Sequence, residues 1–140
     1  MHSMNSDADI QHILAHHRTV AIVGLSPKPH RASFGVAQYL QEHGYRIIPV
    51  NPNAHNVLGQ KAYSSLTEAA AAGESIELVN VFRNSDEVPP VIEEAIAVGA
   101  LAVWLQLGIT NDDAAEMAEA AGLMVVQDRC IKTEHSRLGL

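Results

Sequence analysis

The stretch RTVAIVGLSPKPHRASFGVAQYLQEHG, residues 18–44, places three different patterns in succession. Residues 20–23 are a short apolar run, mostly β-branched, which is typical of a strand buried in a parallel sheet. The polar loop 25–32 follows, and within 33–43 the apolar side chains recur at helical spacing. Gly44 stands where a helix commonly ends. The stretch therefore predicts a strand, a turn and a helix.

The predicted turn has the features of a phosphate-binding site. Unpaired backbone N–H groups and the positive end of the helix dipole meet at a helix start, and Lys28 and Arg31 add full positive charges there. A G-x-G-x-x-G fingerprint beginning at Gly24 would need glycines where Ser26 and Pro29 stand. We therefore expect a longer, more basic phosphate loop, in which Gly24 lets the backbone approach the ligand. The alternative is that glycine and serine serve turn geometry alone.

Length and composition limit the classes of protein to which this chain can belong. At 140 residues with 47% hydrophobic content it has the size of one globular domain, 1–140. The formal net charge of −7 argues against nucleic acid as the main partner. No apolar run is long enough for a signal peptide or a membrane span, so we expect a cytoplasmic protein without a membrane partner. Cys130 is the only cysteine, which fits a reducing compartment.

Five apolar segments alternate with helical patterns along the chain. This alternation predicts an α/β fold: a Rossmann-like, doubly wound, five-stranded parallel sheet with helices on both faces. We expect the strand order 3-2-1-4-5, which would place a ligand crevice between the first and fourth strands at the carboxyl edge of the sheet. A helix is predicted in the N-terminal segment 1–17, and a polar tail at 128–140. The strands after the first are expected at 45–50, 77–82, 101–105 and 123–126.

The expected topology separates the two signs of charge. The acidic residues lie mainly on helices or before strands, whereas most of the cations follow strands and so lie at the carboxyl edge. An acidic protein that gathers its cations at one edge suits a small polyanionic ligand, although helix surfaces also collect glutamates for solubility alone. The cations placed at this edge are Lys28, Arg31, Lys61, Arg83, Arg129, Lys132 and Arg137.

The end of the second predicted strand narrows the choice of ligand. Domains that bind NAD usually carry Asp or Glu there to hold the ribose hydroxyls. This chain has Asn51 and Pro52, and no carboxylate follows through Gln60. Because a carboxylate would repel a phosphate on the ribose, its absence favours coenzyme A or NADP, and both remain open.

The predicted N-terminal helix carries His12, His16 and His17 at spacings that metal ligands can have. No cysteine or nearby carboxylate completes the set, and two or three ligands without supporting groups seldom suffice. We therefore expect no metal site, and a solvent-exposed helix face instead.

From about Thr19 to His135 the chain resembles the small stand-alone CoA-binding protein family, which is similar to the nucleotide-binding domain of the succinyl-CoA synthetase α subunit. The resemblance implies a Rossmann-like fold that binds coenzyme A, or an acyl-CoA, across the carboxyl ends of the strands. That synthetase also needs a domain with a phosphorylated histidine, for which this chain shows no matching context. The segments that carry the resemblance are VGLSPKPHRASFGVAQYL, GYRIIPVNP, LGQKAYSSL, VNVFR, VPPVIEEAIAVGA, VWLQLGI and VQDRCIKTEH.

The resemblance also implies a set of ligand-binding residues. Those after the first strand would line the diphosphate and adenosine end, with Lys28 added as a further cation, and those after later strands would complete the cleft. The residues after the first strand are Gly24, Leu25, Ser26, Arg31 and Ser33. The others are Asn51, Pro52, Phe82, Arg83, Gln106 and Gly108.

Three functions compete on this sequence. The leading one is a non-catalytic module that binds CoA or acyl-CoA as a sensor, carrier or accessory to an enzyme, with an unidentified protein partner left open. A minimal NAD(P)-dependent oxidoreductase is the alternative, weakened by the absence of a second domain for the substrate. A small thioester hydrolase or acyltransferase would use Ser26, His30 or Ser33, but no third group and no G-x-S-x-G complete that chemistry. No catalytic residue is predicted.

Cys130 has two readings. A small, buried, structural side chain at the end of the last strand is expected, since buried free cysteines are usually inert. The alternative is a thiolate favoured by Arg129 and Lys132, which could form a mixed disulfide with CoA.

Overall fold

Five short apolar segments pair into one parallel sheet in the computed structural model, which describes residues 6–140. Nearly every strand residue is buried, because successive side chains point to opposite faces and helices cover both. The predicted α/β, Rossmann-like fold is confirmed. Residues 1–5 of the predicted segment 1–17 lie outside the described residues. The strands are β1 Thr19–Val23, β2 Arg46–Val50, β5 Leu78–Val81, β6 Ala102–Leu105 and β7 Met124–Val126.

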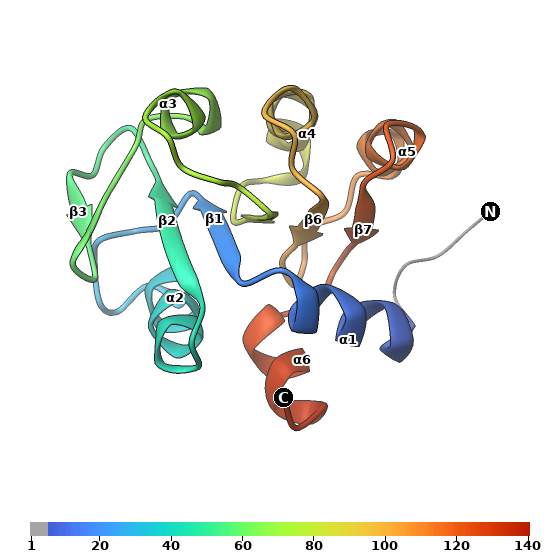
Figure 1. Cartoon of the computed structure of the whole chain (residues 1–140), viewed down its shortest axis with the longest axis horizontal. Helices are drawn as coiled ribbons and strands as arrows, with labels where there is room; N and C mark the ends of the chain where they lie inside the picture. Colours follow the sequence, from blue (N-terminus) through green and yellow to red (C-terminus); the bar gives the residue numbers. More distant parts are fainter. Residues whose placement is uncertain (1–5) are drawn as a thin grey trace.

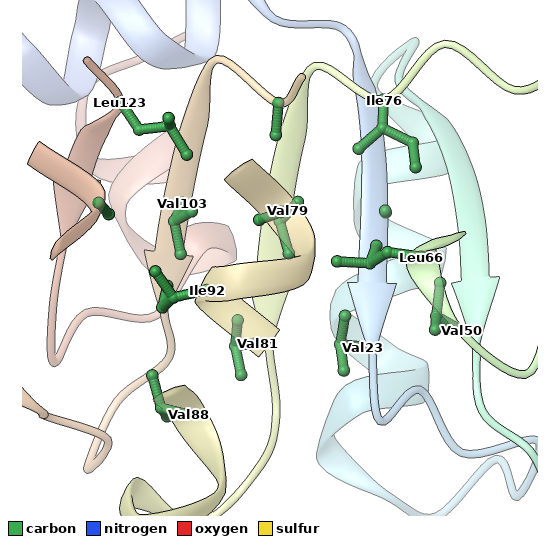
Figure 2. Packing of buried hydrophobic residues seen from close by; sticks show 14 of the residues in the cluster. Val23, Val50, Leu66, Ile76, Val79, Val81, Val88, Ile92, Val103 and Leu123 are labelled. Atoms are coloured by element: carbon green, nitrogen blue, oxygen red, sulfur yellow. The ribbon is translucent and has the colours of Figure 1, made fainter. Parts of the chain in front are cut away.

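The helices form two layers, one on each face of the sheet (Figure 1). On one face, Leu66 and Ile92 pack against a cluster of strand residues that includes Val79 and Val103 (Figure 2). This layer contains α3 Leu66–Ala71, α4 Val88–Ala97 and α5 Asp112–Ala120, with the 3-10 turn Ser85–Glu87 before α4. The opposite layer contains α1 Asp7–His16, α2 Ala32–Glu42 and α6 Ile131–Arg137.

The strand order differs from the predicted 3-2-1-4-5. The sheet runs β2-β1-β5-β6-β7, so the third of its five strands, β5, pairs with β1 rather than with β2. Pro49 supplies the physical reason, because a proline cannot donate to a neighbouring strand and is confined to sheet edges. Its carbonyl accepts a hydrogen bond from the Tyr63 N–H at 3.0 Å, on the side of β2 away from β1. Since β2 is an edge strand, the winding reverses between β1 and β5.

The segment after β2 forms a small hairpin and then returns along that outer edge. In it, β3 Asn56–Val57 pairs antiparallel with β4 Gln60–Lys61. Leu58 and Gly59 between them both have positive φ, 53° and 78°, as a two-residue hairpin turn requires. The Leu58 carbonyl accepts a hydrogen bond from Gln41 of α2 at 3.0 Å, which ties the hairpin to the helix that follows β1.

The predicted polar tail 128–140 contains a helix, α6, that packs against the α1–α2 layer. Arg137 holds it there by donating to Asp7 of α1 at 2.7 Å, and within α6 it also donates to Glu134 at 3.0 Å. The polar composition concealed the helix, because two of the residues that it buries are ionisable. The side chains that α6 buries are those of Ile131, Glu134 and His135.

No helix within residues 6–140 is both long and apolar enough to cross a membrane.

The packing of α6 should make stability depend on pH. His135 Nδ1 lies 2.8 Å from the Tyr39 hydroxyl, and burial, with the positive charges of His43 and Arg18, lowers the pKa of His135 below its usual value. The unfolded chain therefore binds a proton at His135 more readily than the folded chain does. The stabilising contribution of neutral His135 is complete above a pH of about 6.5 and is lost as the pH falls. We expect the free energy of unfolding to decrease between pH 7.5 and 5.5, measured by urea titration.

The variant His135→Gln, which cannot take up that proton, should show a shallower pH dependence over this range. Substitution of an exposed histidine, His55→Gln, is the matched control and should leave the wild-type slope unchanged. Equal slopes for wild type and His135→Gln would contradict the assignment.

Candidate functional site

A pocket of about 700 Å³ opens at the carboxyl edge of β1, β2 and β5, where the winding reverses. In open α/β sheets such a reversal leaves a crevice, because the loops after the two strands turn to opposite faces. The predicted crevice lay between the first and fourth strands, and this one follows the corrected order. We call it the basic pocket. It is lined by Gly24, Ser26, Pro27, Lys28, Arg31, Ala32, Ser33, Asn51, Asn53, Phe82, Arg83, Asn84 and Glu87.

Gly24 lines the basic pocket and lies against the residues that follow β5. It has φ +87°, and a Cβ built on it would lie 2.7 Å from the Phe82 carbonyl oxygen and 3.4 Å from Arg83 Nε. Only glycine fits this backbone without displacing the end of β5. From the sequence, we expected glycine at position 24 because a ligand would approach the backbone there. The structure adds a second reason, since Gly24 lets β1 and β5 end side by side.

The loop between β1 and α2 is held by its own serines. The Ser33 hydroxyl accepts a hydrogen bond from the Ser26 N–H at 3.0 Å, and the Ser26 hydroxyl accepts one from the Lys28 N–H at 3.1 Å. Ser33 was predicted to open the helix, but α2 begins at Ala32 with Arg31 as its N-cap residue. No side chain caps this helix and its first turn has no acid, so its positive end faces the basic pocket uncompensated.

Three cations surround the basic pocket. Lys28, Arg31 and Arg83 all line it, and none forms an ion pair within residues 6–140. Glu87 is the one carboxylate in the lining. The remaining cations of the predicted basic edge have other contacts: Arg129 and Arg137 with carboxylates, and Lys61 and Lys132 over tyrosine rings. The structure therefore concentrates unpaired positive charge in this pocket.

Asn51 joins the loop after β2 to the loop after β1. Its Nδ2 donates to the Leu25 carbonyl at 2.9 Å, and its Oδ1 accepts from the Asn53 N–H at 2.9 Å. Both ends of the amide are thus used within the protein, and Asn51 positions the loops. A carboxylate here would have no proton to donate to Leu25 and would add negative charge beside the cations.

A second pocket of about 360 Å³ lies beside the first, toward β6. We call it the apolar pocket. It shares Ala32, Phe82, Arg83 and Asn84 with the basic pocket, so the two are continuous. Leu107 at its rim is 70% exposed. The rest of its lining is Val36, Gln106, Leu107, Ile109 and Cys130.

The sequence predicted more of the basic pocket than of its neighbour. Leu25 is fully buried, Pro52 and Gly108 line neither pocket, and Gln106 lines the apolar pocket. Sequence reasoning missed five lining residues, none of which carries a positive charge that would single it out. The predicted residues in the basic pocket are Gly24, Ser26, Lys28, Arg31, Ser33, Asn51, Phe82 and Arg83. The missed ones are Pro27, Ala32, Asn53, Asn84 and Glu87.

Cys130 is partly exposed at the apolar pocket and is the N-cap residue of α6. Burial opposes ionisation of its thiol, but hydrogen bonds from Thr133, from Gln106 and from the Lys132 backbone outweigh it, so the net pKa is lowered. Cys130 packs against the core, as a structural side chain would, but it is only partly buried because it also borders a pocket.

Among the described residues, the structure does not bring together the groups that metal binding by histidines or catalysis by the loop serines would need. His12 and His16 stack with ring centroids 4.2 Å apart, and among residues 6–140 no group of three or more His, Cys, Asp or Glu could hold a metal ion. The hydroxyls of Ser26 and Ser33 bond to backbone N–H groups of the loop, and His30 is exposed and lines neither pocket.

A family model for the CoA binding domain matches residues 18–136. The chain belongs to the CoA binding domain family. Uncharacterized protein YneT of Bacillus subtilis (strain 168) is 43% identical over 131 residues, which cover 94% of this chain and 95% of YneT. The fold is shared with a hypothetical protein from Pyrococcus horikoshii OT3, at a TM-score of 0.90 and 39% identity over 100% of this chain and 98% of that one.

The CoA binding domain also resembles part of a larger enzyme. The ADP-forming acetate–CoA ligase of Methanocaldococcus jannaschii is 22% identical over 96% of this chain, and the match covers 20% of the ligase. The family assignment supports CoA binding in general.

The close approach at Gly24 is testable by stability. Gly24→Ala should destabilise the CoA binding domain by about 1–3 kcal/mol, because the new Cβ meets the Phe82 carbonyl and φ is positive. Gly35→Ala is the matched control: Gly35 lies within α2, and its Cβ would have no neighbour within 4 Å. That variant should be neutral or stabilising by up to about 1 kcal/mol. Urea unfolding measures both, and equal effects would refute the constraint.

Proposed function

We propose that this CoA binding domain holds the phosphates of coenzyme A in the basic pocket and acts as a non-catalytic binding module. The observation that carries the proposal is the convergence on one pocket of three cations that form no ion pair with any described residue, at a helix start without a side-chain cap. A sensor, a carrier and an accessory to an enzyme all need such a module.

The electrostatics favour a ligand with several phosphates. A helix N-terminus contributes about 0.3–1 kcal/mol to binding an anion, and a charged hydrogen bond about 1.5–3 kcal/mol. Lys28, Arg31 and Arg83 can supply several such bonds at once. Coenzyme A carries a diphosphate and a 3′-phosphate, so it uses more of these donors than a nucleotide with two phosphates.

The lining of the two pockets supports binding without catalysis. Within residues 6–140 no histidine lines either pocket, and Glu87 is the single carboxylate in the two linings. General acid–base chemistry needs a titratable group within hydrogen-bond reach of the reacting atoms, and nucleophilic chemistry needs a base beside the nucleophile. The Ser26 and Ser33 hydroxyls instead accept hydrogen bonds from backbone N–H groups of the loop.

NADP is the ligand of the competing oxidoreductase function. The loop after β2, which has no carboxylate, would also accommodate the ribose phosphate of NADP. The two proposals differ in the rest of the ligand, because NADP carries a nicotinamide and CoA a long arm ending in sulfur. Direct comparison of the two ligands therefore separates the functions.

Arg31→Ala should weaken CoA binding about tenfold or more, since it removes one charged hydrogen-bond donor. The Arg31 side chain makes no capping bond, so its loss should leave the start of α2 intact. Arg46→Ala is the matched control: it removes the same charge at the opposite edge of the sheet, where Arg46 pairs with Glu74 at 2.7 Å. Isothermal calorimetry should show wild-type affinity for that control.

The ligand series gives a second, independent measurement. CoA should bind more tightly than dephospho-CoA, and NADH weakly or not at all, because each change removes phosphate contacts. Raising the salt concentration should weaken CoA binding through screening. Equal affinity for CoA and NADH, unaffected by Arg31→Ala, would refute the proposal, and preferential binding of NADP would favour the oxidoreductase.

A further inference from the structure

We propose that Asn111 is a positioning residue of the binding site, which fixes the loop after β5 through Ser85 and so sets the place of Arg83 in the basic pocket. The inference rests on the proposed function, since it gives Arg83 a share of the phosphate contacts. Its basis is the network of hydrogen bonds that joins the loops at the carboxyl edge of the sheet.

The amide of Asn111 serves two segments of the chain at once. Its Oδ1 accepts a hydrogen bond from the Ala114 N–H at 3.0 Å and so caps the start of α5. Its Nδ2 donates to the Ser85 carbonyl at 2.9 Å. The Thr110 N–H adds a hydrogen bond to the Ser85 hydroxyl at 3.3 Å. The loop after β6 therefore holds Ser85 at two points, and Ser85 stands two residues after Arg83 in the chain.

Asn111 is itself held by the segment that follows β7. The Asn111 N–H donates to Gln127 Oε1 at 2.7 Å, and Gln127 Nε2 donates to Asp112 Oδ1 at 3.3 Å. The loops after β5, β6 and β7 are thus joined in one network. Asn51 joins the loops after β1 and β2 in a similar manner. One asparagine therefore braces the loops on each side of the reversal between β1 and β5.

Helix capping alone does not use the whole Asn111 side chain. A helix cap needs only an acceptor, and serine, aspartate and asparagine serve about equally well. Serine supplies the side-chain cap at two other helices within residues 6–140, Ser6 at α1 and Ser65 at α3. Asparagine adds an NH2 group, which can reach a second loop while the oxygen stays on the cap. The bond to Ser85 is therefore a tether separate from the cap.

Arg83 is the least exposed of the three cations around the basic pocket. Lys28 and Arg31 are exposed on the loop after β1, whereas Arg83 is partly buried. Its Nε lies 3.4 Å from the position of a Cβ built on Gly24, so the guanidinium lies against the end of β1. A shift of the chain at Ser85 would move Arg83 from this place, and a misplaced donor binds its ligand poorly. Fixing the loop in advance also reduces the ordering needed on binding.

The variant Asn111→Ser separates the tether from the cap. Serine keeps an acceptor for the Ala114 N–H, adds no charge and lacks the NH2 group that reaches Ser85. We expect CoA affinity, measured by isothermal calorimetry, to fall about three- to tenfold, as for the loss of one hydrogen bond. Ser65→Ala is the matched control, because it removes the cap of α3, and no residue of α3 lines either pocket. It should lower stability to urea and leave CoA affinity unchanged.

A double-mutant cycle tests whether Asn111 acts through Arg83. In the Arg83→Ala background, Asn111→Ser should cause no further loss of CoA affinity, since the group that Asn111 positions is absent. In the Lys28→Ala background it should cause its full loss, because the Lys28 N–H is held by Ser26 on the other loop. Coupled residues give non-additive effects, and independent residues give additive ones. A purely structural effect of Asn111→Ser would be additive in both backgrounds.

The outcomes separate this inference from the proposed function. Wild-type affinity in Asn111→Ser, an equal loss in Ser65→Ala, or additive losses with Arg83→Ala would overturn the inference while CoA binding itself still stood. Failure of the wild-type protein to bind CoA would overturn the proposed function and the inference with it.

Discussion

The carbonyl of Phe82 occupies the space that a Cβ at position 24 would need. This contact lets β1 and β5 end side by side, and the rest of the site depends on it. The loops after the two strands then turn to opposite faces, with α2 on one and α4 on the other. The basic pocket opens between them, so the close approach of β1 and β5 also places Arg83 near the loop that carries Arg31.

Some charged residues stabilise the packing of α6, and others line the basic pocket. Glu134 is buried between Arg129 and Arg137, and Arg137 reaches across to Asp7, so these charges fix α6 against α1. The cations of the basic pocket have no such carboxylate partners among the described residues. A buried charge left unpaired is costly, whereas a charge at a solvent-filled pocket remains hydrated until a ligand replaces the water. The pocket can therefore keep its cations available without destabilising the fold.

The fold class was predictable because both layers impose local patterns: apolar runs for buried strands and helical spacing between them. Strand order was not, since it depends on which edge of β2 is free, and a single proline is all that marks that edge in the sequence. The helix α6 was missed for another reason. Its buried face includes Glu134 and His135, which are stabilised by Arg137 and Tyr39, and such partners are distant in sequence.

In the candidate site too, some features follow from residues that are neighbours in the sequence, and others follow from residues that only the fold brings together. The loop after β1 was recognisable from glycine, serine and cations at close spacing, but spacing does not say which way a side chain points. Leu25, which the resemblance placed in the site, is fully buried, and the Ser33 hydroxyl holds the Ser26 N–H within the loop. The apolar pocket has no local signature at all. It exists because the loops after β5 and β6 meet Cys130, and that meeting follows from the strand order that puts β5 between β1 and β6.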